Sequence, residues 1–114
     1  MNEMNRDNNI ISCMADWCGQ IRQAHERFGG SRTCFLNDTV YRNAVSMCLF
    51  QICELAGHLS DEFRTEHPDL PWTQIRGMRN LFALNNGGMD ADTIWQTLIE
   101  DVPVIENFCK KQMG

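Results

Sequence analysis

Residues 71–90 read PWTQIRGMRNLFALNNGGMD and contain signals for both the start and the end of a helix. Pro71 suits the first helical position, because the N–H that proline lacks has no partner there. The run Asn85-Asn86-Gly87-Gly88 predicts the end of the helix, since Asn and Gly tolerate a left-handed C-cap. The apolar residues between these points have the spacing of a helix face that packs on a core: Ile75, Met78, Leu81 and Phe82.

Two arginines, Arg76 and Arg79, stand in this predicted helix without an acidic residue to balance them. A guanidinium is always charged, and its fork of N–H donors matches the oxygens of a phosphate or a carboxylate. An asparagine, Asn80, follows the second arginine directly. The pattern therefore favours a partner that supplies the anion.

The chain has 114 residues, which predicts a single domain over residues 1–114 with a core of its own. Its net charge of −5 argues against a protein that coats nucleic acid over its whole surface. A local basic site remains compatible with this charge, because the field in a cleft depends on where the charges lie.

The six cysteines include no C-x-x-C pair, and the three histidines do not stand at zinc-finger spacing. We therefore expect reduced, mostly buried thiols and no metal or other cofactor. The first residues, MNEMNRD, are polar and do not resemble a signal peptide. No apolar run approaches the ~20 residues that span a membrane, so the expected location is the cytoplasm.

Helical periodicity also marks the first half of the chain. A first helix is predicted over about Asn8 to Phe28, with Gly29-Gly30-Ser31 ending it. A second begins with Asn37 or Asp38 as its N-cap and reaches about Arg64. Because this helix has two apolar stripes, we expect it at the centre of a bundle or against another subunit.

Asp90 or Asp92 is expected to cap a fourth helix, and Pro103 to open a last short one. The sequence contains no strand pattern and no Gly-rich phosphate loop before a helix. The predicted class is all-α, a four- or five-helix antiparallel bundle.

The combination of Trp72, Ile75, Gly77, Arg79 and Asn80 resembles the signature helix of the HEPN superfamily, in its HepT-like branch. The similarity covers about residues 8–108, including the ICELA run of the second helix and the EHPDLPW linker. It implies a small HEPN-like helical bundle. Many members of this branch are ribonuclease toxins.

The family signature is Arg, a polar residue, three more residues and then His, with Tyr two places later in one subgroup. Arg79 and Asn80 match it, whereas Leu84 occupies the His position and Asn86 the Tyr position. Family members cleave RNA without a metal, by attack of the ribose 2′-OH on the adjacent phosphate. The resemblance implies that Arg79 stabilises charge, Asn80 positions the substrate and residue 84 moves the proton, with Arg76 and Asn86 as further contacts to RNA.

Leucine cannot transfer a proton, and loss of a general acid or base typically costs about 10²- to 10⁴-fold in rate. Leu84 therefore predicts a chain that is nearly or wholly inactive as a nuclease. Natural decay of the motif and a deliberate disabling change both account for this residue. In one subgroup an antitoxin modifies a tyrosine with AMP. Asn86 stands at the position of that tyrosine, so this mode of control is not expected here.

Residues 79 and 84 are rotated by about 140° on an ideal helix and do not share a face. They meet only if the helix ends or bends between them, or if a second subunit completes the site. The resemblance implies a homodimer in which both signature helices line one cleft. Glu54 is unusual between the apolar Cys53 and Leu55, and a buried carboxylate that pairs near the arginines is one interpretation of it.

The remaining candidate residues have structural interpretations. We expect His25, His58 and His67 to be surface or hydrogen-bonded histidines, and Trp72 and Trp95 to be core anchors.

Three functions fit these observations. The first is the RNA-cleaving toxin of a toxin–antitoxin pair, whose family partner is a nucleotidyltransferase antitoxin. The second is a non-enzymatic antitoxin or the substrate-binding subunit of a nucleotidyltransferase. The third is a helical dimer whose arginines bind an acidic protein.

Overall fold

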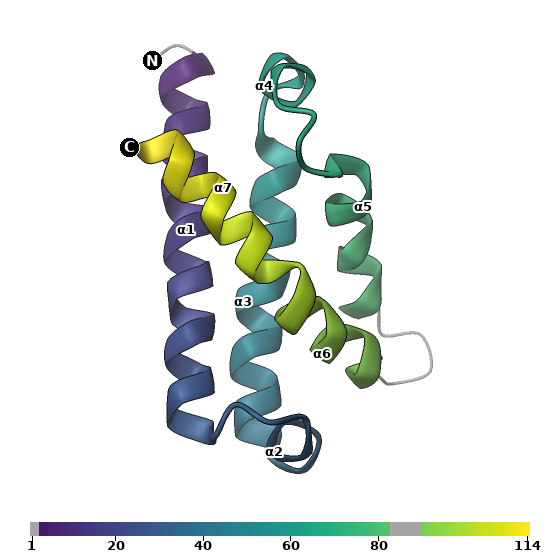
Figure 1. The fold of residues 1–114 in the computed structure, drawn as a ribbon. Coiled ribbons are helices and arrows are strands. Elements are labelled where there is room, and N and C mark those ends of the chain that lie inside the picture. Colours follow the sequence, from purple (N-terminus) through teal and green to yellow (C-terminus); the bar gives the residue numbers. More distant parts are fainter. Residues whose placement is uncertain (1–2, 83–89) are drawn as a thin grey trace.

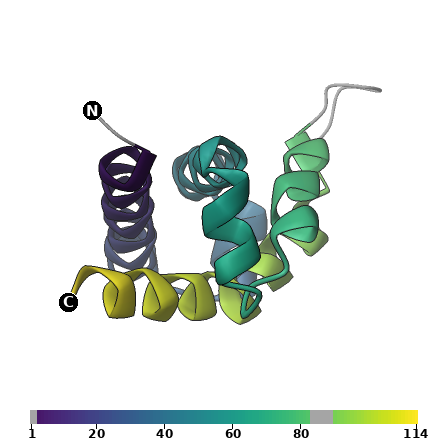
Figure 2. The same cartoon turned by 90° about the horizontal axis from the view of Figure 1, so that it is seen from above.

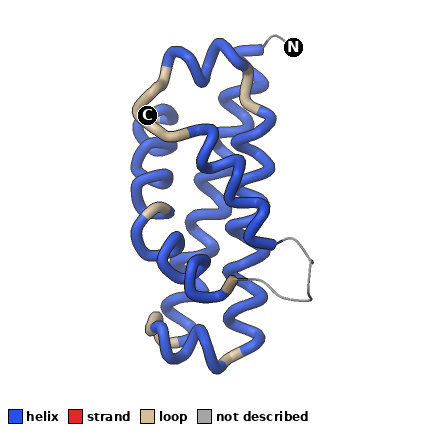
Figure 3. The backbone as a smooth tube through the Cα atoms, turned by 90° about the vertical axis from the view of Figure 1, so that its right-hand side faces the viewer, coloured by secondary structure: helices blue, strands red, loops and turns tan. Residues whose placement is uncertain are grey.

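The computed structural model describes residues 3–82 and 90–114. Within them it contains seven α-helices, one 3₁₀ helix and no strand (Figure 1; Figure 3). The elements are α1 (Glu3–Phe28), α2 (Arg32–Asn37), α3 (Thr39–His58), α4 (Asp61–Glu66), α5 (Trp72–Gly77), η1 (Met78–Phe82), α6 (Ala91–Glu100) and α7 (Val102–Met113). The predicted all-α class is confirmed. Five helices lie where the sequence predicts them, and α2 and α4 are additional short ones.

The two longest helices run antiparallel, with α1 at one side of the molecule and α3 in its middle (Figure 1). Helix α7 crosses one face of this pair, and α6 lies nearer to α5, which flanks α3 on the side away from α1 (Figure 2). The buried core lies among these helices and includes the fully buried Met14, Phe35, Tyr41, Leu49, Ile52 and Ile94. Helix α3 is thus packed on several sides, as its two apolar stripes predict.

Helix α1 begins at Glu3, five residues before the predicted start at Asn8, so it also includes the mostly polar residues that precede the apolar stripe. Its end at Phe28 agrees with the sequence. Gly29 and Gly30 adopt φ values of 99° and 63°, a left-handed conformation that favours glycine. The chain can therefore reverse direction into α2 within a few residues.

The predicted second helix is too long, because α3 ends at His58 and a separate helix, α4, follows. Ser60 caps α4 by accepting a hydrogen bond from the N–H of Phe63. The N–H and the hydroxyl of Ser60 donate to the carboxylate of Asp7, at 2.9 Å and 2.6 Å. Asp7 lies in α1 and is only 5% exposed. A contact between distant parts of the chain thus fixes the break between α3 and α4.

The other helix starts follow the capping rules. Asp38 accepts hydrogen bonds from the N–H groups of Val40 and Tyr41 at the start of α3. Asp90, rather than Asp92, caps α6 by accepting from the N–H and the hydroxyl of Thr93. Helix α7 has proline in its first turn, as predicted, and with 12 residues it is longer than the short last helix that was expected.

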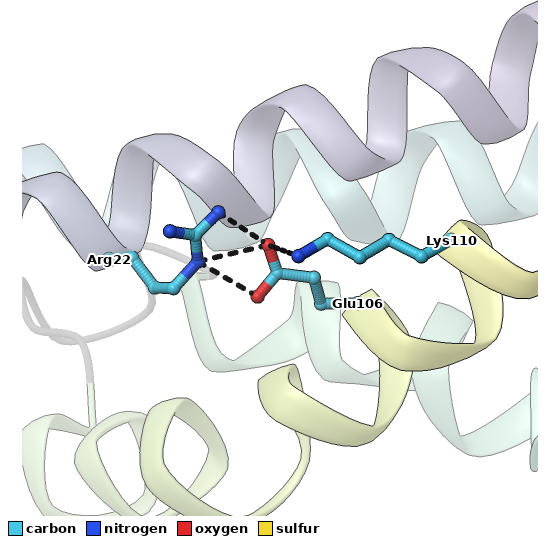
Figure 4. A network of polar contacts seen from close by, with 3 residues as sticks. All are labelled: Arg22, Glu106 and Lys110. Atoms are coloured by element: carbon cyan, nitrogen blue, oxygen red, sulfur yellow. Dashed lines mark hydrogen bonds and ion pairs between the residues drawn. The ribbon is translucent and has the colours of Figure 1, made fainter.

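A charged cluster fastens α7 to α1 (Figure 4). Arg22 donates from Nε and Nη2 to both carboxylate oxygens of Glu106, at 2.9 to 3.1 Å. Lys110 places its Nζ 3.6 Å from Oε2 of the same carboxylate. The hydrogen bond from Arg22 and these neighbouring positive charges lower the pKa of Glu106. Both carboxylate oxygens of Glu106 are thus bound by positively charged side chains, and the cluster holds α7 against α1.

All six cysteines are free thiols, and four are buried: Cys18, Cys48, Cys53 and Cys109. Burial raises the pKa of Cys18, Cys53 and Cys109 to about 12, so these thiols stay protonated. The expectation of mostly buried thiols is confirmed. None of the described helices is long and apolar enough to cross a membrane.

Candidate functional site

Helix α5 and the 3₁₀ helix η1 carry the predicted site and lie against α3 (Figure 2). Trp72 anchors this segment, because its side chain is buried and its indole N–H donates to the carbonyl of His67 at 2.7 Å. Ile75, which is 3% exposed, packs one turn later. Pro71 directly precedes the helix instead of being its first residue, and its carbonyl accepts the first helical hydrogen bond, from the N–H of Ile75.

The predicted helix changes type in its middle. The α-helix ends at Gly77, and residues from Met78 to Phe82 form the tighter 3₁₀ helix. In a 3₁₀ helix, residues three apart lie on the same side, whereas an α-helix rotates them by about 60°. Arg79 and Phe82 therefore face the same way, and they are aligned more closely than in an α-helix.

Three of the predicted site residues come together on this segment. Arg76, Arg79 and Asn80 line one open depression with a volume of about 390 Å³. Thr73 and Gly77 complete its lining, and all five residues are exposed. The arrangement offers two guanidinium groups, an amide and a hydroxyl to one ligand, which suits an anion with several oxygens.

Arg79 has an anionic partner within the chain, which corrects the expectation of two unpaired guanidiniums. Its Nε lies 3.3 Å from Oε1 of Glu54 on α3. The direction of this contact is not that of a hydrogen bond, and within the described residues this buried oxygen accepts none. The Arg79 side chain remains 59% exposed. Its terminal N–H groups therefore stay available to a ligand.

Glu54 matches the predicted carboxylate near the arginines, although its side chain is 30% exposed instead of fully buried. The sequence signal was an acidic residue between two apolar ones in the central helix. Its partner could not be identified in the same way, because Arg79 is 25 residues away and on another element.

Arg76 lies one turn before Arg79, and its side chain passes close to Gly57 on α3. A methyl group added at Gly57 would lie 3.5 Å from Nε of Arg76, an ordinary van der Waals distance. Within residues 3–82 and 90–114, Arg76 forms no ion pair. It is thus the less neutralised of the two arginines.

Leu84 and Asn86, the remaining predicted site residues, lie outside the described residues. The histidines of the described part do not line the depression. His25 forms a hydrogen bond with the hydroxyl of Tyr41, His67 packs on Phe63, and His58 is exposed. Burial lowers the pKa of His25. His25 and His58 thus agree with the expectation of hydrogen-bonded or surface histidines, whereas His67 is half-buried among aromatic rings.

The sequence interpretation missed an aromatic contact beside the site. Phe50 on α3 and Phe82 on η1 meet edge to face, with ring centroids 5.6 Å apart. Phe82 had been predicted as a core residue and does contact the core, but it is only half-buried. The sequence did not mark Phe50 as a candidate site residue, because an apolar residue in an apolar helix is expected to be in the core.

The described residues offer no obvious metal centre. Nowhere among them do three His, Cys, Asp or Glu side chains gather closely enough to hold a metal ion. The side chains that line the depression instead carry two guanidiniums, an amide and a hydroxyl.

Comparison with known proteins gives one family. Residues 18–112 match the family described as "Ribonuclease HepT-like". The chain is 33% identical over 72 residues to a "Putative RNase" of Methanocaldococcus jannaschii, covering 63% of this chain and 66% of the relative. It is 32% identical over 77 residues to a "Putative RNase" of Caldanaerobacter subterraneus subsp. tengcongensis, covering 68% and 69%.

A third relative is the "Probable ribonuclease HepT" of Thermococcus cleftensis, 30% identical over 77 residues, with coverage of 68% and 70%. The matches thus span about two thirds of the length of these three relatives. No solved structure matches the chain significantly. The family match covers most of the chain, and with these relatives it shows that this protein belongs to the HepT-like ribonuclease family of the HEPN superfamily.

Proposed function

We propose that the protein is a HepT-like toxin of a toxin–antitoxin pair whose site binds RNA and whose nuclease chemistry is disabled at position 84. The observation that carries this proposal is the meeting of Arg76, Arg79 and Asn80 in one open depression. An RNA phosphate would accept hydrogen bonds from both guanidiniums and from the amide of Asn80.

In the proposed reaction the ribose 2′-OH loses its proton and attacks the adjacent phosphorus, and the 5′-oxygen leaves and takes up a proton. Negative charge accumulates on the phosphoryl oxygens in the transition state, where the fixed positive charge of Arg79 would stabilise it. No metal is needed for these roles. A histidine at position 84 would transfer the protons near neutral pH. Leu84 cannot, so the chain would hold RNA without cutting it efficiently.

The complete site is proposed to form in a homodimer, with the Arg79 segments of both subunits lining one cleft. The proposed partner is a nucleotidyltransferase antitoxin. Family membership supports both ideas. Because Asn86 cannot be modified as tyrosine can, we propose that this partner neutralises the protein by binding.

The direct test compares RNA cleavage by the chain with Leu84, by Leu84→His and by Leu84→Asn, with EDTA present throughout. Leu84→Asn is the matched control, because it is polar but does not titrate. We expect cleavage by Leu84→His alone, at least about 10²-fold above the other two proteins. Growth arrest on expression of Leu84→His alone would support the toxin assignment. If Leu84→His is as inert as Leu84→Asn, the nuclease proposal is wrong.

A second candidate function is a non-enzymatic subunit, either an antitoxin or the substrate-binding partner of a nucleotidyltransferase. The ion pair between Glu54 and Arg79 favours it, since it partly neutralises the arginine in the absence of any ligand. In this case Leu84→His stays inert, while a nucleotidyltransferase purifies with the natural chain. The third hypothesis, an acidic protein as ligand, predicts that binding of RNA lacks the steep salt dependence of phosphate contacts.

A further inference from the structure

Three contacts repeat along the seam between α3 and the α5–η1 segment. Arg76 crosses Gly57, Arg79 contacts Glu54 at 3.3 Å, and Phe82 meets Phe50 with ring centroids 5.6 Å apart. Residue numbers rise by three at each step on α5–η1 and fall by three or four on α3. The two segments therefore run antiparallel, and the contacts follow one another like rungs.

Helix geometry gives the spacing of these rungs. Three residues advance about 4.5 Å along an α-helix and about 6 Å along a 3₁₀ helix. Arg76, Arg79 and Phe82 thus stand in line, about one turn apart. The 3₁₀ helix aligns Phe82 with Arg79 more closely than an α-helix would. The seam consequently presents two cations and then an aromatic pair.

Phe50 is not part of the described core in the way that its neighbours on α3 are. Leu49, Ile52 and Cys53 are buried, whereas Phe50 is half-buried and lies outside the set of residues that pack against the described core. Phe82 packs partly against the core and also meets Phe50, so the two half-buried rings form one apolar surface. This surface adjoins the pair of Arg79 and Glu54.

A nucleotide carries a phosphate and a base on one sugar, so a site that binds both needs a cation and an aromatic surface side by side. Proteins that bind single strands use this combination, because every base has a flat face that stacks on an aromatic ring. Bases within a duplex are already stacked and paired, and exposing one costs free energy.

We infer that Phe50 and Phe82 form a nucleobase-stacking subsite beside the Arg76 and Arg79 phosphate site, and that the ligand is RNA with an unpaired base. The inference rests on the proposed function. Arg76 and Arg79 beside the aromatic pair can bind phosphate, which favours RNA as the occupant of this surface.

The test uses the natural chain, whose Leu84 lets binding be measured without cleavage. Affinity is measured for a short single-stranded RNA, the same RNA with abasic sites, and its duplex. Phe50→Leu keeps an apolar side chain but removes the ring, and Phe50→Tyr restores a ring. Met47→Ala is the matched control, because Met47 is 55% exposed and lies one turn away on α3.

We expect Phe50→Leu to weaken binding of the single-stranded RNA by about tenfold and to leave the abasic RNA unaffected. Phe50→Tyr and Met47→Ala should bind like the natural chain, and the duplex should bind more weakly. An equal loss for both RNAs, or no loss, would overturn the inference. So would a change in sedimentation of Phe50→Leu, since it would assign the surface to a subunit interface.

The two proposals fail in different ways. If the natural chain binds RNA through Arg79 but binds abasic RNA equally well, only the stacking subsite is wrong. If the natural chain binds no RNA at low salt, the proposed function itself is wrong.

Discussion

The molecule contains two arginine–glutamate pairs of contrasting geometry. Arg22 and Glu106 make three hydrogen bonds of 2.9 to 3.1 Å, and the Glu106 side chain is only 10% exposed (Figure 4). Arg79 and Glu54 make one contact of 3.3 Å, with side chains 59% and 30% exposed. The first pair uses both carboxylate oxygens within the fold. The second leaves most N–H donors of its arginine open to solvent.

This difference separates a structural arginine from a candidate ligand-binding one, although both have a glutamate partner. An exposed pair adds little to stability, about 0 to 1 kcal/mol, because water solvates each charge well. Charge-assisted hydrogen bonds to a buried carboxylate are worth more, about 1.5 to 3 kcal/mol each. Geometry and burial, rather than the presence of a pair, indicate what each arginine does.

The largest expected effect is on catalysis. In a Leu84→His background, Arg79→Ala should lower RNA cleavage by about 10²- to 10³-fold, because the phosphoryl charge loses its stabilising cation. Arg27→Ala in the same background removes an equal charge from α1 and should cleave normally. Single-turnover cleavage rates decide this. Equal rates for the two double variants would remove Arg79 from the mechanism.

The next effect is on folding. Arg22→Ala should lower the free energy of unfolding by about 2 kcal/mol, because it leaves the buried Glu106 with only Lys110 at 3.6 Å. Arg79→Ala should change it by less than about 0.5 kcal/mol. Urea denaturation of both variants measures the contrast. Equal losses would show that the two pairs do not differ as described.

Low pH should weaken the ion pair between Arg22 and Glu106. The pKa of Glu106 is lowered from 4.5 by the hydrogen bond from Arg22, so its contribution is complete above about pH 4.5 and is lost as pH falls through the folded-state pKa. Arg22→Ala should flatten this part of the curve of unfolding free energy against pH. An unchanged acid slope in that variant would contradict the assignment.

His25 should add a separate loss of stability at milder pH. Burial lowers its pKa from 6.5, so the unfolded chain takes up a proton first as pH falls below 6.5. Stability is therefore full above pH 6.5 and declines below it. His25→Gln can still hydrogen-bond to Tyr41 but does not titrate, so this decline should disappear. Thermal unfolding between pH 5 and 8 measures it.

The smallest expected effect is on RNA affinity and concerns Glu54, the acidic partner of Arg79. Glu54→Gln removes the negative charge beside Arg79 and should tighten RNA binding a few-fold at low salt, less at high salt. Glu66→Gln removes the same charge from an exposed position on α4 and serves as the control. Weaker RNA binding by Glu54→Gln, with Glu66→Gln unchanged, would mean that Glu54 positions Arg79 instead of competing for it.

Local signals predicted much of the fold. Asp38 and Asp90 cap helices as their residue types predict, and Gly29 ends α1 through its positive φ. The break after α3 was not predicted, because Phe63 continues the apolar stripe across it. The contact that fixes the break joins Ser60 to Asp7, residues 53 positions apart, and no local pattern records it.

The site was predicted in its parts but not in its geometry. Arg76, Arg79 and Asn80 share a depression, as residues close in sequence on one helix are expected to do. The 3₁₀ segment, the pairing of Arg79 with Glu54 and the contact of Phe82 with Phe50 depend on how two elements pack. The roles proposed for Leu84 and Asn86 remain predictions from the family resemblance.

The central claim is that Arg79 binds an RNA phosphate, whereas Arg22 stabilises the fold. It is tested most directly by the salt dependence of single-stranded RNA binding for the natural chain, Arg79→Ala and Arg27→Ala. Each phosphate contact contributes about 0.7 to the slope of log K against log salt concentration for a single strand. We predict that Arg79→Ala binds more weakly and loses about one such contact, while Arg27→Ala retains the slope of the natural chain. An unchanged affinity and slope for Arg79→Ala would contradict the claim.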